Sequence, residues 1–413
     1  MRLLITDDLE RKRATVFFRV FLVIPHFVWL GLWGIAALFA AFANWIATLA
    51  TGRSHASFHE FLAQYVKYGT QVYGYLLLGA SPYPPFDGRA GYPIDLEIDP
   101  PAPQPRVGVA ARLILAIPAL LLASALFGFP NVSSSRSNAT INDSLGVAHA
   151  AAFLGWFACL ALRRMPRGLR DSVAWGVGFT AQLWAYLFLL TSTYPDCDPS
   201  VVLGELPGRE DAITLRTREG LRRSRLTVFF RLPLAFPHLV WLLLWSLLAL
   251  LAAVANWFAT LATGRPPAAL HSFLSAYVRY QAHVYAFLTL AANPFPGFAG
   301  VPGYPGADVE IAGPARQSRW TVGFRALLAL PALLLSAAFG SLLWSAAFLG
   351  WFAALVTGRM PRMLCNAQLQ VIRYAAQVNG YLCMLTAEYP YGGPCEPAAP
   401  TAPAATTAAL AIG

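Results

Sequence analysis

The residues with the most chemical potential in this sequence are arginines and histidines that recur inside long apolar runs. An arginine stands six residues before a proline in four places, and in two of them a histidine follows the proline directly. A charged side chain at bilayer depth is costly and commonly belongs to a binding site, an ion path or an interhelical contact. The recurring arginines are Arg19, Arg112, Arg231 and Arg325, and the histidines are His26 and His238.

Asparagine completes a candidate polar cluster in two of the four copies. The cluster consists of Arg19, His26, Asn44, Arg231, His238 and Asn256. Proline within a helix frees a backbone carbonyl, and neighbouring polar side chains can satisfy it. The matching residues of the other two copies are Ala119, Gly155, Ala332 and Gly350. We therefore favour helix packing over a substrate site, and we expect local pairing of His26 with Asn44 and of His238 with Asn256.

Arg112 and Arg325 lack these companions and are interpreted as membrane anchors. A long guanidinium side chain near a helix end can reach lipid phosphates, which is called snorkelling. A second possible role of these arginines is a structural hydrogen bond to a neighbouring helix, and a third is substrate binding. Because the arginine recurs in all four copies, an anchoring role is favoured.

Reactive constellations are absent from the sequence. It contains no HExxH, GxSxG or Walker motif and no GxGxxG after an expected strand, and its five cysteines show no CxxC spacing. The apolar segments contain no acidic residue: 14–52, 107–129, 147–162, 226–263 and 320–357. Ion-coupled transporters usually need an intramembrane carboxylate. We therefore predict no catalytic site, no metal site and no cofactor.

Composition indicates a membrane protein. Of 413 residues, 57% are hydrophobic and 12% are charged, whereas a soluble domain carries about 25% charged residues. The net charge of +10 comes from basic clusters at the ends of apolar runs, where membrane orientation places them. A nucleic-acid partner is therefore not expected. Membrane lipids are the expected partners, while self-association or a membrane-protein partner stays open.

Self-alignment divides the chain into four modules. Beyond the arginine–proline pair, a tryptophan recurs as Trp45, Trp156, Trp257 and Trp351, and each module ends in a Tyr-rich helix and an aromatic-proline turn. The expected modules are residues 1–92, 93–200 with an insertion at 129–146, 201–304 and 305–393, followed by a disordered tail at 394–413. Modules one and three match best, as do modules two and four, which indicates duplication of a pair.

This pattern resembles the bacterial membrane-associated family known as domain of unknown function 4389. The resemblance rests on Arg19, Pro25 and His26, the TGR sequence at 51–53, and SPYPPF at 81–86. It covers nearly the whole chain except the tail, although modules two and four lack the histidine. The resemblance implies a location in a bacterial membrane and brings no biochemical activity.

Each apolar stretch is expected to form a helical hairpin. Residues 15–51 would form one helix of about 55 Å, against a hydrocarbon core of about 30 Å. The insertion at 129–146 is polar and Ser/Asn-rich, as loops are. We therefore predict two spans joined by a turn, near Gly34 in module one and near Gly340 in module four.

The third segment of each module, such as 58–78, has a large polar face and is expected to be an interfacial helix or to pack inside a bundle. Eight spans with four interfacial amphipathic helices are favoured over twelve spans, because nearly all basic clusters then face the cytoplasm. Alternating segments at 2–6, 95–98, 212–216 and 308–311 predict short strands before the modules on the cytoplasmic side.

The sequence thus predicts an all-α polytopic protein of the bacterial inner (plasma) membrane, with both termini cytoplasmic. The favoured function is a non-enzymatic structural, lipid-interacting or assembly role. The alternative is a channel or uncoupled transporter, with a path between the odd modules lined by the histidines and asparagines.

Overall fold

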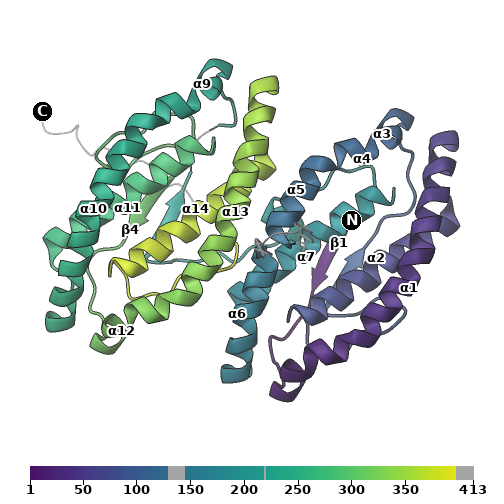
Figure 1. Cartoon of the computed structure of the whole chain (residues 1–413), viewed down its shortest axis with the longest axis horizontal. Coiled ribbons are helices and arrows are strands. Elements are labelled where there is room, and N and C mark those ends of the chain that lie inside the picture. The colour runs from purple at the N-terminus through teal and green to yellow at the C-terminus, as the bar shows by residue number, and fades with distance from the viewer. Residues whose placement is uncertain (129–144, 218–219, 397–413) are drawn as a thin grey trace, which may run out of the picture.

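The computed structural model describes residues 1–128, 145–217 and 220–396 (Figure 1). The insertion expected at 129–146 and the tail expected from 394 lie mostly outside these residues. Four long-helix regions run along the chain: α1 (Arg13–Thr51), α3 to α6 (Arg106–Ala110, Arg112–Leu115, Ile117–Leu126, Val147–Leu162), α9 and α10 (Arg225–Phe229, Arg231–Thr263), and α12 and α13 (Arg319–Gly323, Arg325–Thr357).

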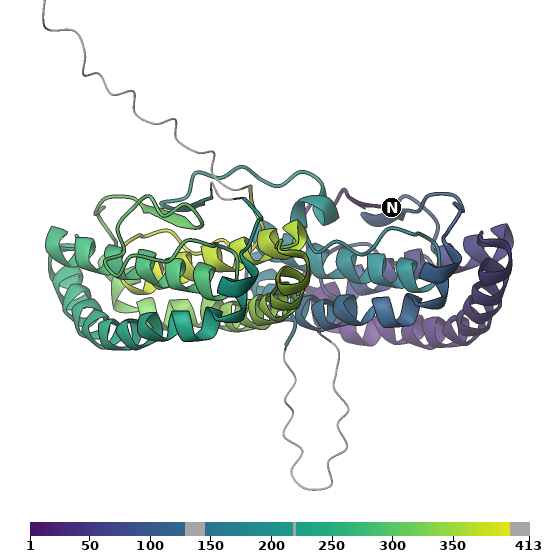
Figure 2. The ribbon, with the colours of Figure 1, turned by 90° about the horizontal axis from the view of Figure 1, so that it is seen from above.

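A second helix follows each long region. These are α2 (Ala56–Leu76), α7 (Arg167–Leu187), α11 (Ala268–Leu288) and α14 (Arg362–Leu382), and a short helix α8 (Pro199–Leu203) follows α7. Figure 2 shows the resulting layers: the long helices form one face, the second helices lie in the middle, and strands and loops cover the other face. We call the long helices the bow helices, and the two sides the bow face and the strand face.

The predicted hairpins are wrong. Gly34 lies inside α1 and Gly340 inside α13, and both helices continue through them. A lone glycine costs an apolar helix only about 1 kcal/mol, and nothing near these positions supplies the Asn, Asp or Pro chemistry of a tight turn. The bow helices are bowed instead, and the outer ends of α1 and α10 rise toward the strand face (Figure 2).

In module two, the bow is broken where the turn of the hairpin was expected. Its bow is interrupted between Leu126 and Val147, a place that corresponds to Gly340 of module four. In modules one, three and four, one continuous helix stands where two separate helices were expected. Among the described residues, three helices are long and apolar enough to cross a membrane: Arg13–Thr51, Arg231–Thr263 and Arg325–Thr357.

The second helices pack on both sides rather than lying alone at a surface. In α7, Trp175 and Phe179 are fully buried, and α7 contacts α2, α5 and α6. In α14, Tyr374 is buried and donates a hydrogen bond from its hydroxyl to the carbonyl oxygen of Ala332, 3.1 Å away in α13. The mixed polar and apolar faces of the second helices are therefore used for packing inside a helix bundle.

Short strands form at all four expected places. β1 (Arg2–Ile5) pairs antiparallel with β2 (Ile94–Glu97), and β3 (Ile213–Arg216) pairs antiparallel with β4 (Asp308–Ile311). Ile94 is fully buried, and its Cδ1 lies near Gly74 of α2 and Gly79 of the turn that follows. Each two-stranded sheet joins the beginnings of two consecutive modules.

The chain forms two similar halves, residues 1–200 and 201–396. The halves meet at the even modules, where α13 packs against α5 and α6. The bow helices α1 and α10 of the odd modules consequently lie at opposite ends of the molecule (Figure 1). The order across the molecule is module one, two, four, three.

Candidate functional site: the repeated arginines, histidines and asparagines

Arg19 is buried, and its guanidinium serves the end of the second helix of its own module. It is 2% exposed. One Nη1 donates to the carbonyl oxygens of Tyr75 and Ala80, the latter at 3.0 Å. The guanidinium carbon also lies 4.3 Å from the centre of the Tyr75 ring. Arg19 therefore joins α1 to the turn after α2.

The other three arginines repeat this arrangement. Arg112 donates to Thr191 at 3.2 Å, Arg231 donates to Ala292, and Arg325 donates to Thr386 at 3.1 Å, always at a carbonyl oxygen. Each also lies over an aromatic ring: Tyr186, Phe287 and Tyr381. All are 2–3% exposed. None reaches the surface, so snorkelling does not describe them, and the hydrogen bond between elements does.

The acceptors lie at the end of each second helix and in the turn that follows it. Tyr75 is in the last turn of α2, whereas the other acceptors come four residues after the helices end: Ala80, Thr191, Ala292 and Thr386. The last four carbonyls of a helix lack internal donors, and each second helix ends in a residue with a left-handed backbone. These residues are Leu78, Leu189, Leu290 and Met384, with φ of 64°, 62°, 68° and 56°. A cation beside a helix C-terminus also interacts favourably with its dipole. The arginines thus hold the turn that follows each second helix, and Arg19 also bonds the last turn of α2.

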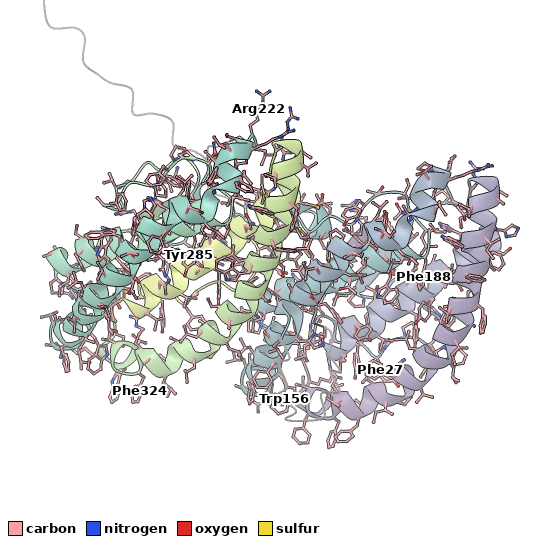
Figure 3. All side chains as sticks on the ribbon, turned by 45° about the horizontal axis from the view of Figure 1, so that its top comes forward. Phe27, Trp156, Phe188, Arg222, Tyr285 and Phe324 are labelled. Atoms are coloured by element: carbon pink, nitrogen blue, oxygen red, sulfur yellow. The ribbon has the colours of Figure 1, made fainter. Side chains whose placement is uncertain are left out.

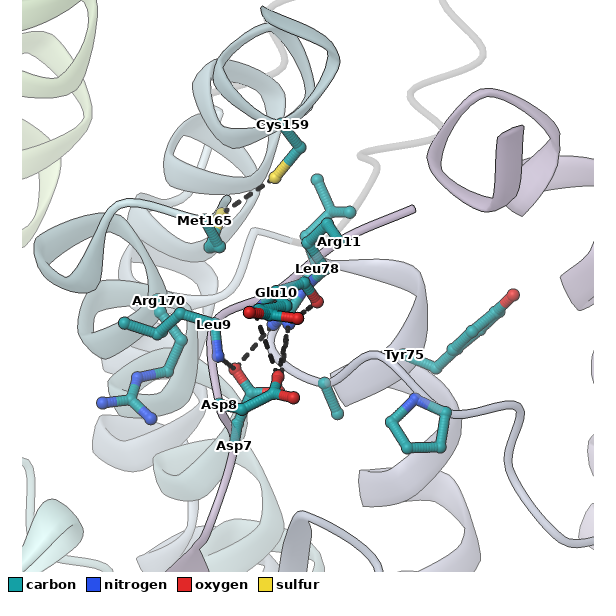
Figure 4. Close-up of polar contacts among 12 residues, drawn as sticks. Asp7, Asp8, Leu9, Glu10, Arg11, Tyr75, Leu78, Cys159, Met165 and Arg170 are labelled. Atoms are coloured by element: carbon teal, nitrogen blue, oxygen red, sulfur yellow. Dashed lines mark hydrogen bonds and ion pairs between the residues drawn. The ribbon is translucent and has the colours of Figure 1, made fainter. Parts of the chain in front are cut away.

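A second set of capping residues was missed in the sequence. Arg11 donates to the carbonyl oxygen of Leu78 at 2.9 Å and forms a buried ion pair with Asp7 at 2.7 Å, as Figure 4 shows. Gln104 donates to Leu189 at 2.7 Å at the equivalent position of module two. The corresponding donors are Arg223 to Leu290 and Gln317 to Met384. The constant offsets between modules could have identified these positions.

A third repeated arginine caps the bow helix of the neighbouring module. Arg13 donates to the carbonyl oxygen of Ala161 at 2.7 Å, and Arg106 donates in return to Ala50 at 2.7 Å. In the C-terminal half, Arg225 donates to Val356 and Arg319 to Ala262. Modules one and two, and modules three and four, are thereby bonded head to tail.

The two histidines sit in equivalent aromatic boxes. Nδ1 of His26 lies 2.7 Å from the Tyr68 hydroxyl, and its ring stacks on Phe86 with centroids 4.3 Å apart. His238 repeats this with Tyr280 at 2.8 Å and Phe298 at 4.3 Å. Both histidines are fully buried. The boxes join α1 to α2 and α10 to α11, together with the following aromatic-proline turns.

The asparagines do not meet the histidines, so the expected local pairs are wrong. Nδ2 of Asn44 donates to the carbonyl oxygen of Phe188 at 3.2 Å, in module two. Asn256 likewise donates to Cys383 at 2.9 Å, in module four. In a continuous helix, residues 26 and 44 are separated by about 27 Å at 1.5 Å per residue. The asparagines instead cap the second helix of the paired module.

The small residues of the even modules make room for methionine. A Cβ added to Gly155 would approach Met165 Cε at 2.6 Å, and one on Gly350 would approach Met360 Cε at 2.6 Å. At the place where the odd modules have the amide of asparagine, the even modules have a glycine and the buried thioether of a methionine. This accounts for the exchange of asparagine for glycine between odd and even modules.

The candidate cluster is therefore dispersed. Arg19, His26 and Asn44 lie in three different contacts along α1, and the residues of α10 lie at the opposite end of the molecule (Figure 1). None of the five described cavities is lined by a histidine of either odd module. Among the described residues, no group of three or more His, Cys, Asp or Glu side chains could hold a metal ion.

Comparison with known proteins gives a family and no nearer relative. No curated protein and no solved structure matches the chain. A family model matches residues 13–87, 225–299 and 319–393, which correspond to modules one, three and four and together make up more than half of the chain. The chain belongs to the family described as Domain of unknown function (DUF4389).

Proposed function

We propose that this protein is a non-enzymatic integral membrane protein, built from four copies of one module, that interacts with membrane lipids and holds a structural or assembly role. The observation that carries the proposal is the separation of the two faces. Large apolar side chains such as Phe39 and Leu251 are exposed along the bow helices. Aromatic residues such as Phe27 and Phe324 add to this surface (Figure 3). Such a surface requires lipid as its solvent.

The four-module organisation is supported by the contacts that recur with the sequence repeat. In each module, one buried arginine bonds the end of its own second helix or the turn after it, and a second, exposed arginine bonds the neighbour's bow helix. The channel alternative, with a path between the odd modules, receives no such support, because His26 and His238 lie in separate boxes in different halves.

We further propose that the strand face lies in the cytoplasm of a bacterial inner membrane, with both termini there. Basic residues at the bow ends, among them Arg53 and Arg164, follow the positive-inside rule on this side. The insertion of module two enters the chain at the middle of the bow, and its polar sequence favours a position on the far side of the membrane.

Single-cysteine labelling in intact cells tests this arrangement. In a variant whose five cysteines are replaced, Glu97→Cys places a thiol at the end of β2, and Leu145→Cys places one just before α6. An impermeant maleimide should label Leu145→Cys from outside and Glu97→Cys only after lysis. Labelling of Glu97→Cys in intact cells would refute the proposed orientation, and protection of Leu145→Cys would show that the bow stops within the bilayer.

A further inference from the structure

Two cavities meet between the bow helices of the C-terminal half. One, of about 210 Å³, is lined by α11, α13 and α14. The other, of about 470 Å³, is lined by α10, the end of α14 and the start of α13. Asn379 of α14 lines both cavities. Joined at Asn379, they form a groove with α10 and α11 on one side, α13 on the other and α14 as its floor, which we call the C-half groove.

The groove opens among side chains of the apolar surface. Leu250 and Val254 of α10 and Trp344 of α13 line it and are exposed to the outside. Seen from the bow face, α14 lies behind the space between α10 and α13 (Figure 1). Tyr285 of α11, labelled in Figure 3, also lines the smaller cavity. Whatever enters the groove therefore enters from the side that carries the exposed apolar residues.

The lining determines the chemistry of an occupant. Its one charged residue is Arg325, whose guanidinium already donates to Thr386 and Gln317. The amides of Asn379 and Gln281 bond each other at 2.7 Å, so they do not demand a polar ligand. Much of the remaining wall is small: Ala249, Ala253, Ala282, Ala326, Gly340 and Ala375. A Cβ added at Gly340 would meet no atom within 4 Å.

We propose that the C-half groove binds one acyl chain of a membrane lipid, an inference that rests on the proposed membrane embedding of the bow helices. An acyl chain is narrow, flexible and uncharged, and a groove that opens into lipid meets it at high concentration. A helix of a second protein, at about 10–12 Å in diameter, is too wide for cavities of about 210 and 470 Å³.

In the N-terminal half, the counterpart of the smaller cavity is partly plugged. Trp184 stands at the position of Asn379, and Phe127 stands at the position of Gly340. Both rings line this counterpart, whose volume is about 130 Å³ against about 210 Å³ in the C-terminal half. Trp184 packs against Phe188 with ring centroids 5.5 Å apart. The N-terminal half therefore serves as an internal control for the open groove of the C-terminal half. We expect each protein molecule to bind one acyl chain.

Native mass spectrometry of the delipidated protein in detergent tests the inference. The probe is palmitoyl-oleoyl phosphatidylcholine, whose zero net charge weakens its attraction to the basic bow ends. We expect the wild-type chain to retain one molecule. Asn379→Trp and, independently, Gly340→Phe should weaken retention about tenfold or more, equal to about 1.4 kcal/mol. Trp184→Asn should add a second retained molecule.

Leu251→Trp is the matched control, because it adds an indole to the exposed surface of α10 outside the groove. It should retain lipid like the wild type. Wild-type retention in both Asn379→Trp and Gly340→Phe, with unchanged melting temperatures, would overturn the acyl-chain site. Failure of Trp184→Asn to add a molecule would overturn the plug. Fractionation of every variant with the membrane reports separately on membrane embedding, so a failed groove is distinguishable from a failed function.

Discussion

Nε1 of Trp45 donates a hydrogen bond to the carbonyl oxygen of Val109, 3.1 Å away in the first turn of the next module. Its counterpart Trp156 donates in return to Val16 at 3.3 Å. In the C-terminal half, Trp257 donates to Val322 at 2.7 Å and Trp351 to Val228 at 3.0 Å. The tryptophan that marks each repeat thus bonds the first bow turn of the paired module, and the paired module returns the same bond.

Replacing Trp257 with Phe should weaken the pairing of modules three and four. The ring would still fill space, but the hydrogen bond from the indole to the carbonyl of Val322 would be lost, which costs about 0.5–1.5 kcal/mol. Thermal unfolding in detergent measures this as a lower melting temperature. Trp320→Phe is the control, because Trp320 is 79% exposed. Equal melting temperatures for the two variants would argue that the hydrogen bond is unimportant.

Arg19→Lys should be poorly tolerated. A buried ammonium cannot reproduce the planar contact with Tyr75 together with two carbonyl acceptors, and a misplaced buried charge costs about 3–5 kcal/mol. We expect lower yield in the membrane and a lower melting temperature. Arg89→Lys, on an exposed loop, should change neither. If Arg19→Lys behaves like Arg89→Lys, the side chain anchors to lipid after all.

Tyr68→Phe should destabilise the His26 box. The substitution removes the hydroxyl that lies 2.7 Å from Nδ1 and leaves a buried nitrogen without its partner, at a cost of about 1–3 kcal/mol. A double-mutant cycle with His26→Phe isolates the pair, because removing both polar groups should cost less than the sum of the single changes. Additive losses would show that the two residues are not coupled.

The native thiols should be slow to react in the folded protein. All five cysteines are buried, and burial raises the pKa of Cys197 and Cys395 and raises that of Cys383 to about 12. Because the thiolate forms only above the raised pKa, little of it is present at pH 8, where an ordinary cysteine is partly ionised. Titration with a thiol reagent should count none rapidly in detergent and five after denaturation.

The sequence predicted the repeats well because they are local patterns. The strands and the four second helices lie close to where alternation and periodicity place them, as α2 at Ala56–Leu76 illustrates. The predicted hairpins were wrong because they rested on the length of the apolar stretch compared with the thickness of the bilayer. A 39-residue helix such as α1 exceeds one perpendicular span, but bowing accommodates that length without a turn.

The site could be predicted only in part. The arginines were recognised as special, yet their acceptors are backbone carbonyls, such as that of Thr191, which any residue type provides. No sequence pattern marks such an acceptor. Asn44 was assigned to the wrong partner because the hairpin would have brought it beside His26, whereas the continuous helix carries it to Phe188 of the next module.

The reciprocal hydrogen bonds between modules imply that modules should occur in pairs. Module one completes the bow helix of module two through Arg13 and is completed by Arg106 in return, so a module standing alone would keep an unused donor and an uncapped helix end. Proteins made of such units should therefore hold even numbers of them, and a chain with a single unit should find its second half in another copy of itself.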